Sequence, residues 1–122
     1  MAGKKIVVLD DEKYITQLLN IELEASGYEV KTACDGEAGL ELIRAERPDL
    51  ILLDLMMPKM DGFEVLQALR IDMMTKNIPV IILTAKSSDR DIDRCLELGV
   101  RDYIVKPFHG ELLVKKIGRL IS

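Results

Sequence analysis

Residues 50 to 62, Leu-Ile-Leu-Leu-Asp-Leu-Met-Met-Pro-Lys-Met-Asp-Gly, constrain the fold of this chain more than any other stretch. The run opens on apolar residues, as is typical of a strand buried on both faces, and one carboxylate, Asp54, stands where the run meets a loop. An ionised carboxylate without partners is costly to bury. Asp54 therefore lies either at the exposed carboxyl end of its strand or close to matching cations.

Short apolar runs alternate with helical patterns along the whole chain. We expect strands at 5–9, 28–33, 50–54, 80–84 and 101–105, separated by stretches whose apolar residues recur at helical spacing. The connections are a few residues long, and no linker or repeat interrupts them. This rhythm predicts an α/β fold, a doubly wound parallel sheet with helices on both faces. The length of 122 residues predicts a single domain over 1–122.

Several polar side chains fall at the ends of these expected strands. Parallel strands end along one edge of their sheet, where such folds bind ligands. The residues in question are Asp10 with Asp11, Asp54, Thr84 and Lys106. Gathered carboxylates raise one another's pKa unless a cation lies among them, and Mg²⁺ prefers such oxygen ligands and often works beside a phosphate. An acid nucleophile, a metal, a hydroxyl and a lysine are the parts that phosphoryl transfer requires.

Composition excludes several other classes of protein. The formal net charge of −4 argues against a surface that binds nucleic-acid phosphates directly. The longest apolar runs fall short of the roughly 18 residues of a membrane span, and the amino terminus does not resemble a secretory signal. Cys34 and Cys95 lack the spacing of a zinc or redox motif. We therefore expect a cytoplasmic protein with reduced cysteines and no membrane contact.

Four motifs occur in order along the chain: Val-Leu-Asp-Asp-Glu at 8–12, Leu-Leu-Asp-Leu-Met-Met-Pro-Lys-Met-Asp-Gly at 52–62, Leu-Thr-Ala at 83–85 and Asp-Tyr-Ile-Val-Lys-Pro-Phe at 102–108. Together they resemble the response-regulator receiver domains of two-component signalling, a chemotaxis-regulator-like, flavodoxin-like family. The resemblance extends from Lys5 to Ile121. It implies a five-stranded sheet with the strand order 2-1-3-4-5.

The resemblance also implies a phosphoacceptor and a metal site. Asp54 would accept a phosphoryl group from the phosphohistidine of a sensor histidine kinase or a phosphotransfer protein. Asp10 or Asp11, Asp54 and the backbone carbonyl of Met56 would hold Mg²⁺, and in the family the second acid of the pair is usually the direct ligand. The chain would then be a signalling switch rather than an enzyme, assisting only its own phosphorylation and dephosphorylation.

Further residues would report the phosphorylation, again by resemblance. Lys106 would contact the phosphoryl group, and its peptide bond to Pro107 would be cis. Thr84 would move toward the phosphoryl oxygens while Tyr103 rotates inward behind it. This pair would change the face built from the fourth helix, the fifth strand and the fifth helix, which a downstream protein or output domain would read. The chain would be a monomer or a phosphorylation-dependent dimer.

Two positions near the phosphoacceptor, Met56 and Lys86, vary across the family and influence how long the phosphoryl group survives. Met56 offers neither an acid nor an amide to orient an attacking water, which favours slower hydrolysis. Lys86 would extend either toward the phosphate or into solvent. These residues are therefore expected to tune the lifetime of the phosphorylated state.

Plainer roles and other functions compete with this interpretation. Asp10 and Asp11 would also suit the positive end of the helix that follows them, and Asp61 is expected to be a helix N-cap without a chemical role. An aspartate-nucleophile, Mg²⁺-dependent phosphatase would need a second Asp two positions after its nucleophile, and Asp54 is followed by Leu55 and Met56. A flavin carrier of the same topology would place its cofactor phosphate against the acids at 10–12, which would repel it.

Overall fold

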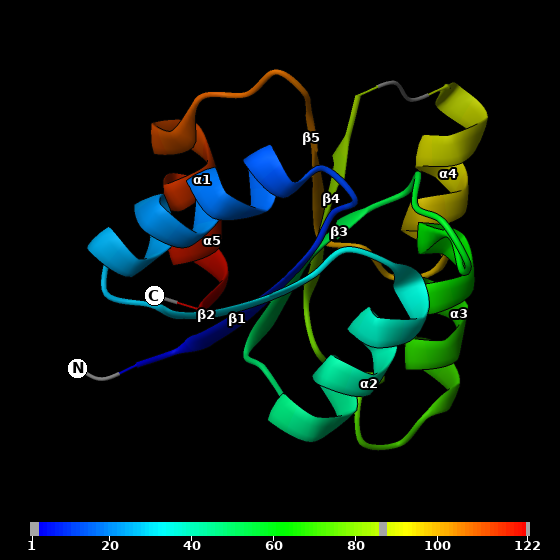
Figure 1. The fold of residues 1–122 in the computed structure, drawn as a ribbon. Coiled ribbons are helices and arrows are strands. Elements are labelled where there is room, and N and C mark those ends of the chain that lie inside the picture. Colours follow the sequence, from blue (N-terminus) through cyan, green and yellow to red (C-terminus); the bar gives the residue numbers. More distant parts are fainter. Residues whose placement is uncertain (1–2, 86–87, 122) are drawn as a thin grey trace.

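The computed structural model describes residues 3–85 and 88–121, and its centre is a parallel sheet (Figure 1). The strands lie in the order β2-β1-β3-β4-β5, which confirms the predicted fold class and strand order. Their bounds are β1 Lys5–Leu9, β2 Glu29–Ala33, β3 Leu50–Asp54, β4 Val80–Thr84 and β5 Asp102–Val105.

Five helices alternate with these strands and cover both faces of the sheet (Figure 1). α1 and α5 lie on one face, and α2, α3 and α4 lie on the other. Each face has its own apolar cluster, the first including Leu23 and Ile117, the second including Ile43 and Leu66. The helix bounds are α1 Lys13–Ala25, α2 Gly36–Glu46, α3 Gly62–Ile71, α4 Asp89–Glu97 and α5 Gly110–Ile121.

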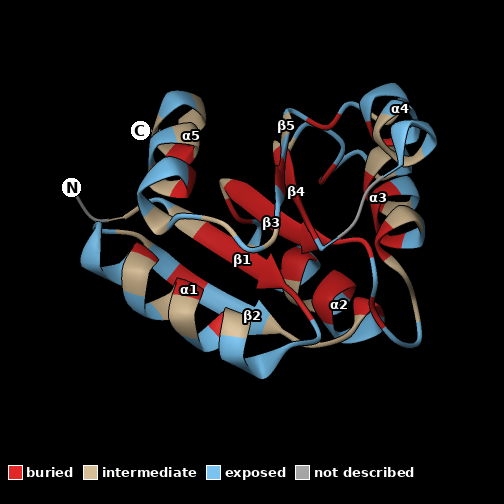
Figure 2. Cartoon of the chain, turned by 90° about the horizontal axis from the view of Figure 1, so that it is seen from above, coloured by how far each residue is buried: buried red, intermediate tan, exposed pale blue. Residues whose placement is uncertain are grey.

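β3 occupies the middle of the sheet, between β1 and β4. Every residue of the strand is buried, as expected for a central parallel strand, whereas the outward sides of the helices are exposed (Figure 2). In the register of the sheet, Leu53 lies beside Leu9 on one side and Ile82 on the other, and Asp54 lies beside Leu83. Packing on both faces of β3 therefore fixes the position of the Asp54 carboxylate at the end of the strand.

The loop after β3 returns closely to the strand. Asp61 caps α3 as predicted, because its side chain accepts the Glu64 N–H while the Glu64 carboxylate accepts the Asp61 N–H. At Gly62 an added Cβ would lie 2.6 Å from the Asp54 carbonyl oxygen and 2.6 Å from Leu55 Cα. The absence of a side chain at this position therefore lets α3 begin directly against the end of β3.

Two expected strands are one residue shorter than predicted at their amino ends. Tyr28 precedes β2, because its N–H closes the end of α1 by donating to the Leu23 carbonyl, next to Gly27 with its φ of 97°. Arg101 precedes β5 and donates its N–H to the Val80 carbonyl. Among the described residues, none of the helices combines the length and apolarity needed to cross a membrane.

Candidate functional site

The Lys106 side chain lies among three carboxylates at the carboxyl edge of the sheet. Its Nζ lies 2.6 Å from Asp10 Oδ2, 3.3 Å from Glu12 Oε1 and 3.4 Å from Asp54 Oδ2. The Lys106, Asp10 and Asp54 side chains are 8%, 0% and 5% exposed, whereas Glu12 reaches in from solvent at 57%. The acids come from the ends of β1 and β3, and Lys106 follows β5. Residues far apart in the sequence thus form one compact ionic group.

Asp54 is held in a setting that favours its protonated form more than water does. Burial raises the pKa of Asp54 to about 6, and the nearby charge of Asp10 acts in the same direction. The Met56 N–H, which donates to Asp54 Oδ1 at 3.1 Å, and the Lys106 ammonium oppose this rise in pKa. The carboxylate is therefore buried, incompletely compensated and suited to gain from a further cation or a covalent partner.

The acids at the end of β1 form a close group of carboxylates. Oxygens of Asp10, Asp11 and Glu12 all lie within 4.8 Å of one another, and Asp54 is not part of that set. Asp10 Oδ1 accepts the Glu12 N–H at 2.9 Å. Within the described part of the chain, Asp10 Oδ2 is a buried side-chain oxygen that makes no hydrogen bond of favourable geometry, although it is ion-paired with Lys106. Spare lone pairs on hard oxygen donors fit Mg²⁺.

Asp10 and Asp11 differ in environment. Asp10 is fully buried, whereas Asp11 is exposed. The Asp10 N–H donates to the Ala33 carbonyl at 3.1 Å, so the backbone stays tied to the sheet for one residue beyond β1. Glu12 was not among the predicted site residues. Its position as the third acid of the run was the available signal, but its approach to Lys106 depends on where α1 begins.

The two expected switch residues lie in β4 and β5. Thr84 is buried at the end of β4, and its carbonyl accepts the Lys106 N–H at 2.7 Å. Tyr103 is 40% exposed, and it lines with Thr84 a small apolar hollow under α4. The peptide bond between Lys106 and Pro107 is cis.

Of the two positions expected to tune the lifetime of the phosphoryl group, the structure describes only Met56. Met56 follows Asp54 closely and is 72% exposed, so its side chain projects into solvent beside the acids. Lys86 lies outside the described residues.

The raised pKa of Asp54 predicts a specific dependence of stability on pH. The ordinary value is 3.8 and the folded value is about 6, so the folded protein binds more protons than the unfolded chain between these values. The free energy of unfolding contributed by this group therefore falls as pH rises through that window, by up to about 3 kcal/mol. Without metal at pH 7.5, Asp54→Asn should be more stable than the wild-type chain, and the gap should close toward pH 4. Urea unfolding in EDTA across this range measures it, and a variant less stable at pH 7.5 would contradict the prediction.

Comparison with protein families and curated proteins adds independent findings. The model of the family described as response regulator receiver domain matches residues 6–118. The chain is 50% identical over 106 residues to the alkaline phosphatase synthesis transcriptional regulatory protein PhoP of Bacillus subtilis, covering 87% of this chain and 43% of that protein. It is 43% identical over 117 residues to the DNA-binding dual master transcriptional regulator RpaA of Synechocystis, covering 96% and 48%. The chain thus spans about half the length of these relatives.

Solved structures agree with this similarity over nearly the whole chain. The chemotaxis protein CheY4 of Vibrio cholerae has a TM-score of 0.92 at 35% identity, covering 98% of this chain and 100% of that chain. The receiver domain of the sensor histidine kinase PA1611 from Pseudomonas aeruginosa has a TM-score of 0.89 at 30% identity, covering 98% of each chain. That structure is described as having a magnesium ion coordinated in the active site cleft.

Proposed function

This chain belongs to the response regulator receiver domain family of two-component signalling, and on that premise we propose that Asp54 is its phosphoacceptor. The observation that carries the proposal is the buried contact of Lys106 with both Asp54 and Asp10. The Asp54 carboxylate thus lies beside the Lys106 ammonium, which is able to pair with phosphoryl oxygens. It also lies near the carboxylates at the end of β1, which suit a metal ion. Nothing in the comparisons favours the alternative of an aspartate-nucleophile phosphatase.

The donor in this proposal is a phosphohistidine of a sensor histidine kinase or a phosphotransfer protein. An Asp54 carboxylate oxygen forms a bond to phosphorus, the bond from phosphorus to the imidazole nitrogen breaks, and the imidazole leaves with the bonding electrons and takes a proton from water. Lys106 is close enough to pair with the phosphoryl oxygens once they are attached to Asp54. The single negative charge of Asp54 is exchanged for the larger negative charge of the phosphoryl group, which Lys106 offsets in part.

Asp10, Asp11 and Asp54, with the backbone carbonyl of Met56, are the groups we propose as holders of Mg²⁺. When bound, the ion would neutralise charge on the transferring phosphoryl group. Glu12 is a further oxygen donor of the same cluster. Asp10 contributes a buried oxygen whose present partner is Lys106, so a metal ion would share a carboxylate with this lysine rather than displace an existing hydrogen bond.

The readout in this proposal is the surface of α4, β5 and α5. Thr84 moves toward the phosphoryl oxygens on Asp54. Tyr103, which is partly exposed, then rotates inward behind Thr84. A downstream protein or an output domain recognises the changed surface. The chain presents that surface either as a monomer or as a phosphorylation-dependent dimer. The names of PhoP and RpaA describe transcriptional regulators, which supports an output on gene expression. A cytoplasmic location is part of the same proposal. Residues 1–122 act as one receiver domain.

Beryllofluoride with Mg²⁺, a mimic of an aspartyl phosphate, tests the switch without a kinase. In an isotopically labelled protein we expect the amide resonances of Thr84 and Tyr103 to shift, together with those of α4 and α5. The reason is that a group on Asp54 alters the charge around Lys106, whose own N–H is bonded to the Thr84 carbonyl. Fluoride with Mg²⁺ but without beryllium is the control. Identical spectra with and without the mimic would contradict the proposed switch.

A further inference from the structure

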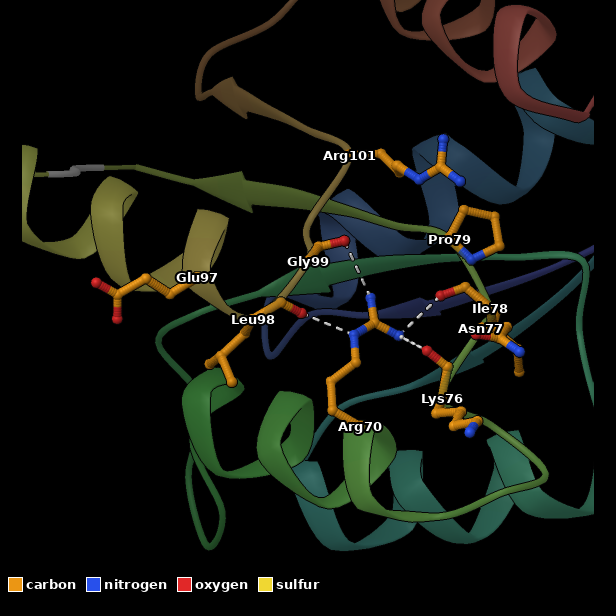
Figure 3. A pocket seen from close by; sticks show the side chains of 9 residues that line it. All are labelled: Arg70, Lys76, Asn77, Ile78, Pro79, Glu97, Leu98, Gly99 and Arg101. Carbon is orange, nitrogen blue, oxygen red and sulfur yellow. Dashed lines mark hydrogen bonds between the residues drawn. The ribbon is translucent and has the colours of Figure 1, made fainter.

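A polar pocket lies at the opposite edge of the sheet from the ionic group around Lys106, where β4 and β5 begin (Figure 3). Its volume is about 410 Å³, within the lower part of the range typical of small-molecule sites. Its walls are the end of α3, the segment before β4 and the turn between α4 and β5. The proposed phosphorylation chemistry uses none of its residues.

Arg70 forms the floor of this pocket. Its Nε donates to the Leu98 carbonyl at 2.7 Å, and its Nη1 donates to the Lys76 and Ile78 carbonyls at 2.9 and 3.1 Å (Figure 3). Its Nη2 donates to the Gly99 carbonyl at 3.4 Å. These contacts join the carboxyl end of α4 to the segment that leads into β4. The guanidinium thereby has carbonyl partners, but it has no carboxylate partner among the described residues.

The charges around the pocket are unbalanced. Arg70, Lys76 and Arg101 bring three cations to the lining, and Glu97 brings the single carboxylate. Within residues 3–85 and 88–121, none of these four side chains takes part in an ion pair. The charge of Arg101 adds to burial in lowering the pKa of Arg70, so the two guanidinium groups repel each other. This local excess of positive charge occurs in a chain whose net charge is −4.

We propose that this pocket binds a small anion of the phosphate class, such as a pyrophosphate or a phosphorylated metabolite. Arg101, Lys76 and Asn77 line the pocket and carry side-chain N–H donors, and the volume admits more than one phosphate group. A bound anion relieves the repulsion between Arg70 and Arg101. It also links the segments that precede β4 and β5, so it should stabilise the folded chain. This inference does not depend on phosphorylation of Asp54.

The site is tested by titrating the unphosphorylated, labelled protein with pyrophosphate in EDTA. Because EDTA removes metal ions, the acids at 10–12 repel pyrophosphate and do not provide a competing binding site. We expect saturable amide shifts at Lys76, Asn77, Gly99 and Arg101. Arg101→Gln should weaken binding by about fivefold or more, since it removes a charged donor. Glu97→Gln should tighten binding, since it removes the one opposing charge. Arg119→Gln, which makes the same change in net charge on the exposed side of α5, should leave the affinity unchanged.

Three results would overturn the proposal. The first is that sodium chloride at matched ionic strength reproduces the shifts, which would reduce them to screening. The second is that the shifts are confined to the carboxyl edge around residues 10–12 and 54–56. The third is that Arg101→Gln and Arg119→Gln weaken binding equally, which would reduce the effect to net charge.

Discussion

We expect replacement of Asp54 by Asn to abolish phosphorylation of this chain by acetyl phosphate in the presence of Mg²⁺. The wild-type protein should gain the mass of one phosphoryl group, because the Asp54 carboxylate lies beside Lys106 at the edge of the sheet. The amide that replaces this carboxylate has no anionic oxygen with which to attack phosphorus. Its nearly equal volume leaves the packing of β3 intact, so the loss should be complete while the fold is retained. Intact-mass spectrometry over a time course measures both proteins.

Asp61→Asn is the matched control for this experiment. It makes the same chemical change in the loop that follows β3, and Asn caps a helix about as well as Asp, so the cap of α3 should survive. We expect labelling of this variant at the wild-type rate. Undiminished labelling of Asp54→Asn would show that another residue accepts the phosphoryl group, and would remove Asp54 from the mechanism.

We expect replacement of Lys106 by Met to destabilise the chain at neutral pH in the absence of metal. The substitution leaves Asp10 and Asp54, which are 0% and 5% exposed as side chains, buried without their cation. Removal of one partner from a buried ionic group typically costs about 3 to 5 kcal/mol. We expect a loss of about 3 kcal/mol in the free energy of unfolding, measured with urea at pH 7.5 in EDTA. Added Mg²⁺ should restore more stability to this variant than to the wild-type protein, because the ion supplies the missing positive charge.

Lys116→Met provides the comparison for Lys106→Met. Lys116 pairs with Asp102 at 2.6 Å, but the two side chains are 23% and 34% exposed. A partly exposed ion pair contributes about 1 kcal/mol or less, so this variant should lose little stability and should not respond specifically to Mg²⁺. Equal losses in the two lysine variants, or the absence of any extra Mg²⁺ effect in Lys106→Met, would contradict the ionic account of the site.

The architecture and the convergence of Asp10, Asp54 and Lys106 could be predicted because they follow from one geometric rule. Apolar runs that alternate with helical patterns specify a parallel sheet, and the residues that end parallel strands meet along one edge. The central position of β3 also explains why an acid at its end is held rigidly. These conclusions need only the order of the strands and helices, which can be predicted from the spacing of apolar residues.

Other features depend on details that spacing does not record. Which of Asp10 and Asp11 is buried follows from the hydrogen bond of Asp10 N–H to Ala33, one residue beyond the end of β1. The contact of Glu12 with Lys106 depends on the exact start of α1. The basic pocket around Arg70 joins helix ends and loops whose side-chain directions are set only by tertiary packing. A pattern of residue types does not determine such contacts between segments.

The residue that carries the phosphoryl group can be identified chemically. After reaction with acetyl phosphate and Mg²⁺, borohydride reduces an aspartyl phosphate to homoserine, which peptide mass spectrometry locates to a single residue. We expect homoserine at position 54 and at none of the acids at 10–12. Homoserine at position 10, 11 or 61, or a phosphoryl adduct at any residue other than Asp54, would contradict this assignment.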